Sequence, residues 1–156
     1  MPHIHEKIDF CADTYVVNGD TALLRLHDKH KVWLPPGGHI ELDEDPVQAA
    51  LREVEEEVGL RATLLGDPAD VGKEFENILP PRFLNCHRIN EIHEHISLIY
   101  FATSSHRDVV QGEQEISDHI KWFTKEELDD PQYGIDSAIR YYAKAALAAA
   151  QKESPR

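Results

Sequence analysis

The stretch GHIELDEDPVQAALREVEEEVGL, residues 38–60, carries the strongest structural signal in the chain. Asp45 is a good helix N-cap, and Pro46 suits the first helical position. Apolar residues then recur at helical spacing, at Val47, Ala50, Leu51, Val54 and Val58. Gly59 stands where a left-handed residue commonly ends a helix. The sequence therefore predicts a helix over 46–58 with one apolar face.

A second, acidic stripe runs along the same predicted helix. Residues 38–60 hold six Glu and two Asp against one Arg, a net charge of −7 out of −13 for the chain. On the helical wheel Glu53, Glu56 and Glu57 share this stripe, whereas Glu55 points away from it. Repulsion between Glu53 and Glu57 costs roughly 0.2–0.5 kcal/mol, and the helix dipole disfavours anions near the C-terminal end. A solvated face is the ordinary interpretation, but a divalent cation such as Mg²⁺ would reverse this balance.

The residues before the helix provide a second wall for such a cation. Pro35 and Pro36 stiffen the chain, and Gly37 and Gly38 permit backbone angles that other residues resist. Without a Cβ, their carbonyls can approach a cation and their amides a phosphate. A Gly-Gly pair alone is usually a turn, so its weight comes from the acidic helix that follows.

The spacing matches the Nudix box at every specified position: Gly38, Glu44, Arg52, Glu53, Val54, Glu56, Glu57, Gly59 and Leu60. The box covers 23 of the 156 residues, and the stretch 33–38 and the pair Trp122-Phe123 are also similar to the family. The chain therefore resembles the Nudix hydrolases. The resemblance implies a Nudix-like α/β/α sandwich, with a mixed β-sheet between helices, and a single domain over 1–156.

The resemblance also implies a reaction, namely hydrolysis of a nucleoside diphosphate linked to another moiety, with Mg²⁺ or Mn²⁺ as cofactor. Glu53, Glu56 and Glu57 would bind the metal, with the Gly38 carbonyl as a further ligand. Arg52 would orient carboxylates by ion pairing. Val54 and Leu60 would lie in the core.

Several roles stay open at this stage. Arg52 would pair with Glu56 or Glu44, and Glu44 would be structural or an auxiliary base. Closely packed carboxylates share protons, so the general base is not assigned to one residue, and Glu53 and Glu56 are the two candidates. Nudix enzymes also recruit a later acidic residue, for which the candidates are Glu113 and Glu115; a solvated loop is the alternative for that pair.

The substrate is less well indicated than the reaction. A nucleoside triphosphate cleaved to monophosphate and pyrophosphate is the first expectation, with a nucleotide sugar, a dinucleotide or a non-catalytic ligand-sensing module as alternatives. Family markers for diphosphoribose and dinucleoside-polyphosphate substrates, a Pro and a Tyr after the box, are absent at positions 75–78. Phe75, Arg82 and Phe83 could stack a base and meet a phosphate; covering the sheet edge is the alternative.

Other elements follow from local patterns. Thr14–Val17 and Thr21–Leu26 flank Asn18-Gly19, a strong hairpin signal. Further strands are predicted at 40–42, 62–65, 83–88, 95–102 and 119–123. Thr124 and Glu127 form a capping box that opens a short helix, and an Ala-rich amphipathic segment predicts a terminal helix over about 136–151. The long connection from Gly66 to Pro81 is of a kind that is often functional.

Composition limits the partners. A formal charge of −13 argues against nucleic-acid and anionic-membrane binding. The resemblance implies a small nucleotide substrate as the partner. Cys11 and Cys86 form no metal or disulfide motif, and no signal-like apolar run opens the chain, so a reduced, cytoplasmic location is expected. A homodimer is compatible with the resemblance.

His3-x-His5 and His93-x-His95 have strand spacing that puts both rings on one side, as in a transition-metal site or an ordinary polar strand face.

Overall fold

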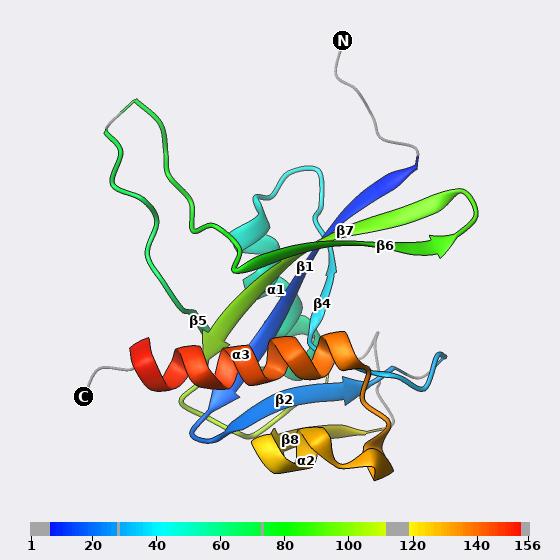
Figure 1. The fold of residues 1–156 in the computed structure, drawn as a ribbon. Helices are drawn as coiled ribbons and strands as arrows, with labels where there is room; N and C mark the ends of the chain where they lie inside the picture. Colours follow the sequence, from blue (N-terminus) through cyan, green and yellow to red (C-terminus); the bar gives the residue numbers. More distant parts are fainter. Residues whose placement is uncertain (1–6, 28, 73, 112–118, 154–156) are drawn as a thin grey trace.

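The sheet of this protein lies between two helices, as the sequence predicts (Figure 1). A computed structural model describes residues 7–27, 29–72, 74–111 and 119–153. Helix α1 (Pro46–Val58) covers one face of the eight-stranded sheet, and helix α3 (Ser137–Glu153) crosses the other face. This arrangement is the predicted α/β sandwich.

The sheet is mixed, because one of its strand pairs is parallel. The strands are β1 (Ile8–Asn18), β2 (Thr21–Leu26), β3 (Trp33–Leu34), β4 (Gly37–His39), β5 (Thr63–Leu64), β6 (Phe83–Asn90), β7 (His93–Thr103) and β8 (Ile120–Thr124). The order is β3-β2-β1-β7-β5, with β4 beside β1, β6 beside β7 and β8 beside β2. Strands β1 and β7 run parallel over ten residue pairs, and this pairing forms the centre of the sheet.

The predicted hairpin at Asn18-Gly19 is confirmed, but the strand expected at 40–42 is wrong. Strand β4 instead occupies Gly37–His39 and pairs with Cys11–Asp13 of β1. Leu42 is fully exposed, and the segment turns where the Glu44 amide donates to the Glu41 carbonyl. The alternation of apolar and acidic residues in this segment therefore reflects a turn at the surface.

Helix α1 begins and ends as predicted. The Asp45 side chain accepts from the Val47 and Gln48 amides, and Gly59 adopts the left-handed conformation with φ of 66°. Its inner face differs from the predicted one, because Leu51 is exposed whereas Ala49 and Glu57 are buried. Ala49 and Ala50 pack with Ala12 of β1 and Tyr100 of β7 in one buried cluster.

The helices enclose two sides of the core. Val54 and Val58 of α1 pack on Val16 and Leu23, as expected for the apolar stripe. On the other face, α3 packs its alanines and Leu147 on strand residues that include Tyr15, Val17 and Phe101. Helix α2 (Lys125–Asp129), opened by the predicted Thr124 capping box, and a short 3₁₀ turn (Pro131–Tyr133) lead into α3. In the described parts of the chain, no helix has the length and apolarity that a membrane crossing requires.

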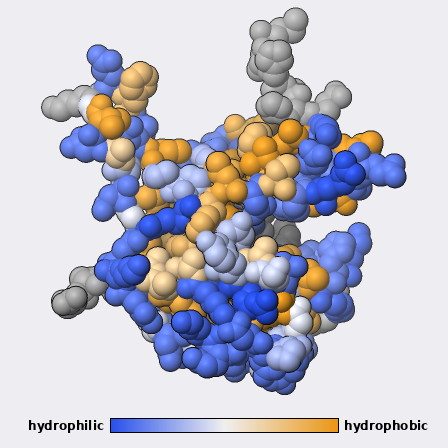
Figure 2. All heavy atoms as spheres, in the orientation of Figure 1, coloured by the Kyte–Doolittle hydropathy of each residue, from blue (hydrophilic) through white to orange (hydrophobic). Residues whose placement is uncertain are grey.

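Figure 2 shows where hydrophobic side chains reach the surface on the face of the molecule that carries α3. They gather above α3, over the strands of the sheet, whereas the lower part around α2 is mostly hydrophilic. Leu84 and Ile89 of β6 and Ile92 of the following turn are among the exposed hydrophobic residues. The β6–β7 hairpin, which carries these residues, extends beyond the cover of α3 (Figure 1).

The two thiols are predicted to differ sharply in reactivity. Cys86 is exposed on β6, whereas Cys11 is buried on β1. Burial, with a smaller contribution from nearby carboxylates, raises the pKa of Cys11 to about 12. Because the thiolate is the reactive form, a disulfide reagent at pH 8 should titrate one thiol per native chain and the second only after unfolding. Cys86→Ser should remove the fast reaction, and two fast thiols in the native wild type would contradict this prediction.

Candidate active site

Arg52 gathers three of the acidic side chains predicted for the site. Its guanidinium donates to Glu44 at 2.6 and 3.0 Å, to Glu53 at 2.8 Å and to Glu56 at 3.0 Å. The alternatives left open for Arg52 are thus both present, and Glu53 is added. These four residues, here called the Arg52 cluster, join the turn that precedes α1 to the middle of the helix.

The electrostatics of the Arg52 cluster are strongly asymmetric. The hydrogen bonds from Arg52 hold the pKa of Glu44 below its ordinary value, so this carboxyl is ionised at neutral pH. Glu44 and Glu53 keep only 12% of their side-chain surface exposed, whereas Glu56 keeps 62%. Three carboxylates against one guanidinium leave two negative charges at a partly exposed edge of the helix.

Gly38 provides the second wall, as its place before the helix suggests. A Cβ built on Gly38 would lie 2.5 Å from Glu53 Oε1, well inside contact distance. Only glycine therefore lets the Glu53 carboxylate lie directly against the β4 backbone. Arg52 also donates to the carbonyl of the next residue, His39, at 3.0 Å, which ties β4 to the helix.

Glu57 occupies a different environment from the other box carboxylates. It is 3% exposed, and it pairs with Arg25 of β2 and accepts the Gly37 amide at 2.9 Å. The sequence reasoning missed Arg25, since nothing local marks a lone arginine in an apolar strand. Glu57 thus links the glycine turn before α1 to strand β2.

These donors fit a hard divalent cation. Mg²⁺ and Mn²⁺ take oxygen ligands, and carboxylate oxygens with a nearby backbone carbonyl are the oxygens that this site offers. The two excess negative charges of the Arg52 cluster would be neutralised by one such ion. The close fit of Glu53 against Gly38 is consistent with this use, because it brings a carboxylate beside the β4 backbone.

The remaining predicted site residues are placed elsewhere or not described. Glu113 and Glu115 lie outside the described residues. Arg82 forms a two-pronged ion pair with Glu153 of α3, at 2.6 and 2.8 Å. Phe83 packs on Phe101 and Tyr142, whereas Phe75 is 77% exposed. Arg82 and Phe83 thus hold the terminal helix, and their contact with a substrate stays a prediction.

A second group of ionisable side chains lies on the face of the sheet opposite α1. His93 and His95 of β7 share this face, as the sequence predicts, and Asp9 of β1 and His39 of β4 join them. Burial, together with the neighbouring imidazoles, lowers the pKa of His95, which is therefore neutral at pH 7. Sequence reasoning missed Asp9 and His39, because only strand pairing brings them to the other two. His3 and His5 lie outside the described residues.

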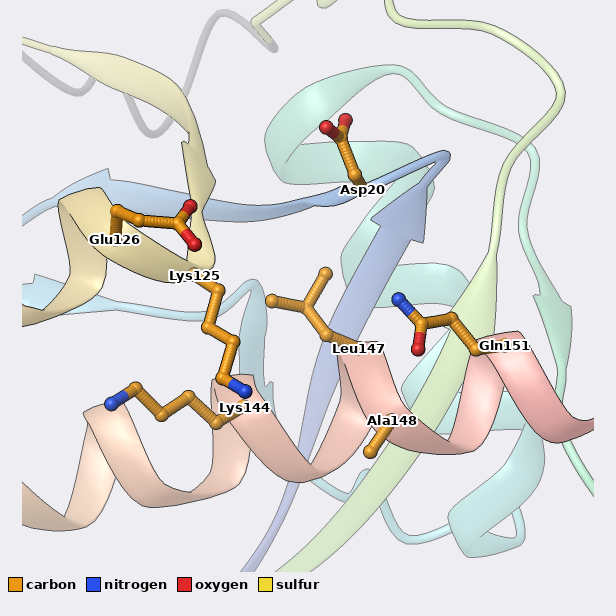
Figure 3. A pocket seen from close by; sticks show the side chains of 7 residues that line it. All are labelled: Asp20, Lys125, Glu126, Lys144, Leu147, Ala148 and Gln151. Atoms are coloured by element: carbon orange, nitrogen blue, oxygen red, sulfur yellow. The ribbon is translucent and has the colours of Figure 1, made fainter.

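A pocket beside α2 and α3 is separate from both groups (Figure 3). It is lined by Asp20, Lys125, Glu126, Lys144, Leu147, Ala148 and Gln151. Lys144 is engaged by Asp129 at 2.5 Å. The pocket shares no residue with the Arg52 cluster and does not contribute to the candidate active site.

A mixed sheet between helices, with a carboxylate-rich helix facing a glycine turn, is the arrangement expected of a Nudix hydrolase. The sequence model of the NUDIX domain matches residues 10–144, most of the chain. The chain belongs to the NUDIX family of hydrolases, whose members generally use divalent metals and act on small nucleotides.

Solved and curated relatives agree with this assignment. A NUDIX-family hydrolase from Clostridium perfringens superposes with a TM-score of 0.80 at 33% identity, covering 90% of this chain and 96% of that one. A probable DHNTP pyrophosphohydrolase of Lactococcus lactis is 32% identical over 62% of this chain and 55% of its own length. The m7GpppN-mRNA hydrolase NUDT17 of Danio rerio is 66% identical over 32% of this chain and 17% of its length. The chain thus spans about half the length of the Lactococcus relative and less than a fifth of the Danio relative.

Proposed function

We propose that this Nudix hydrolase cleaves a phosphoanhydride bond in a small nucleoside diphosphate derivative, with a nucleoside triphosphate as the first candidate. The observation that carries the proposal is the Arg52 cluster, in which Arg52 bonds both Glu53 and Glu56, and Glu53 lies against the β4 backbone at Gly38. The products would be a nucleoside monophosphate and pyrophosphate.

The box residues have distinct parts in this proposal. Glu53, Glu56 and Glu57, with the Gly38 carbonyl, would hold Mg²⁺ or Mn²⁺. When bound, such an ion neutralises phosphate oxygens and lowers the pKa of a coordinated water. Arg52 keeps Glu53 and Glu56 aimed at one place. Either of these two carboxylates would accept the proton of the attacking water, since Arg52 holds both in one cluster.

Glu44 and the glycine turn serve as supports. Glu44 bonds Arg52 through both carboxylate oxygens and accepts the Glu41 amide at 2.9 Å, so it orients Arg52 and shapes the turn into α1. This geometry favours a structural role for Glu44 over that of an auxiliary base. Glu57 fixes Gly37 and thereby the position of the Gly38 carbonyl.

The substrate class rests on charge and on the relatives. The name of the Lactococcus relative specifies a pyrophosphohydrolase of DHNTP, a small molecule, whereas the name of the Danio relative specifies an mRNA. A charge of −13 disfavours a polyanionic RNA chain, because a long phosphate backbone needs Lys and Arg to displace its counterions. A small nucleotide carries few phosphates, which one or two cations can screen.

The decisive experiment is hydrolysis of a substrate panel by wild type and Glu56→Gln in parallel, with Mg²⁺ and then Mn²⁺. The panel contains canonical and oxidised nucleoside triphosphates, DHNTP, ADP-ribose, nucleotide sugars, dinucleoside polyphosphates, a cap analogue and a 5′-triphosphorylated RNA. We expect turnover of a small triphosphate, reduced more than about 100-fold in Glu56→Gln.

The matched control is Glu55→Gln, one residue away on the exposed side of α1, which should retain wild-type turnover. Turnover confined to nucleotide sugars or dinucleotides would replace the triphosphate by the alternative substrate. Binding without turnover by folded protein, with either metal, would overturn the catalytic proposal in favour of a ligand-sensing module.

A further inference from the structure

Four metal-binding side chains from three strands converge on the face of the sheet opposite α1. Asp9 of β1 lies opposite His95 of β7 in the parallel register, and His39 of β4 lies opposite Cys11, two residues along β1. His93 precedes His95 on the same side of β7. One ligand atom from each of the four residues lies within 4.8 Å of the other three. These residues, Asp9, His39, His93 and His95, are called the histidine cluster below.

The distances within the histidine cluster match those between the ligands of one ion. His95 Nε2 lies 3.0 Å from His93 Nε2 and 3.3 Å from His39 Nε2. Asp9 Oδ2 lies 3.2 Å from His93 Nε2 and 3.5 Å from His39 Nε2. Two ligands each about 2.0–2.1 Å from a tetrahedral Zn²⁺ are separated by about 3.3 Å. Four of the six ligand pairs therefore have the separation that a four-coordinate ion imposes.

The ligand atoms of the histidine cluster suit a different ion from the one that suits the carboxylates of the Nudix box. Three imidazoles and one carboxylate suit Zn²⁺ and similar transition ions, whereas Mg²⁺ prefers oxygen ligands alone. The histidine cluster is also open to entry, because the side chains of Asp9 and His39 are 45% and 56% exposed. Neither the Arg52 cluster nor Glu57 contributes a ligand to it.

Strand β4 separates the two groups and connects them. Glu53 lies against Gly38 from the α1 side, while the side chain of the next residue, His39, reaches His95 on the opposite side. The His39 carbonyl accepts a hydrogen bond from Arg52. An ion in the histidine cluster would therefore clamp β4 to β1 and β7 directly behind the candidate active site.

We propose that Asp9, His39, His93 and His95 form a second metal site that binds one Zn²⁺-type ion, independently of the box carboxylates. The site joins three strands, so its occupancy stabilises the edge of the sheet that carries Gly38. The proposal does not depend on the substrate or on turnover, since it concerns metal binding alone.

The test uses untagged full-length protein, freed of metal with a chelator and titrated with Co²⁺ and with Zn²⁺ against a chromophoric chelator. We expect one tightly held ion per chain, with the visible absorption of tetrahedral Co²⁺. Glu56→Gln and Glu57→Gln should retain it. The variant His93→Asn/His95→Asn should weaken Zn²⁺ binding by more than about 100-fold, because loss of an outer-shell partner alone costs 10–100-fold. Zn²⁺ should also raise Tm in the wild type and not in this variant.

Two further variants keep the outcome decisive. Asp9→Asn alters a single exposed ligand and should also weaken binding. His27→Asn/His30→Asn removes another pair of neighbouring histidine rings, whose centroids are 4.8 Å apart. This variant should leave Zn²⁺ binding and the rise in Tm unchanged. Absence of a tightly bound ion in the wild type, or its survival in His93→Asn/His95→Asn, would overturn the proposal. Loss in Glu56→Gln would instead assign the ion to the box.

Discussion

Replacing Glu53 with Gln is expected to lower kcat by about 10³-fold with the nucleotide that the wild type hydrolyses at saturating Mg²⁺. The change keeps the size of the side chain and removes its charge. Glu53 is the box carboxylate that lies against Gly38, and it is bonded to Arg52 at 2.8 Å. One excess negative charge would remain in the Arg52 cluster instead of two, so the Mg²⁺ concentration for half-maximal activity should also rise.

The measurement is kcat as a function of Mg²⁺ concentration for wild type, Glu53→Gln and the exposed control Glu55→Gln. Thermal unfolding of each variant shows whether the fold is retained, and Glu53→Gln should lose little stability, since Arg52 keeps Glu44 and Glu56 as partners. A kcat within tenfold of wild type would remove Glu53 from both candidate roles, metal ligand and general base.

The largest loss of stability is expected from Arg25→Met. Arg25 and Glu57 form a buried ion pair, with 10% and 3% of their side chains exposed. Removing the arginine would leave a buried carboxylate without its counter-charge, which costs about 3–5 kcal/mol. For a domain of this size that corresponds to a fall in Tm of about 10 °C. Equilibrium unfolding in urea measures the difference.

A second substitution identifies the cause of that loss. In Arg25→Met/Glu57→Gln the residue at 57 is neutral and still accepts the Gly37 amide. If the uncompensated charge is responsible, this double variant should recover at least about half of the lost free energy of unfolding. A double variant as unstable as Arg25→Met would show instead that packing of the Arg25 stem carries the effect.

The fold was most predictable where its determinants are local. The N-cap at Asp45, the left-handed Gly59 and the Thr124 capping box each act within one helical turn, and the structure shows all three. The Asn18-Gly19 hairpin is equally local. The box match predicted the fold class for the same reason, since its spacing describes one helix and the turn before it.

Prediction was weaker wherever a residue depends on a distant partner. The acidic stripe correctly grouped Glu53 and Glu56, but it placed Glu57 beside them, whereas the structure buries Glu57 against Arg25. The helical wheel gives the direction of a side chain and not what lies opposite. The strand at 40–42 failed similarly, because pairing with β1 begins at the glycines.

By itself, the sequence determined the box helix, its caps and the chemical class of the site, because these depend on residues within a few positions of one another. Only the tertiary structure decided which strands pair. Parallel pairing of β1 with β7 brings Asp9 opposite His95 across more than eighty residues, and β4 adds His39 to them. The apolar pattern of a strand shows which of its faces is buried, but it does not show which strand pairs with it. The histidine cluster could therefore be recognised only after the sheet had been assembled.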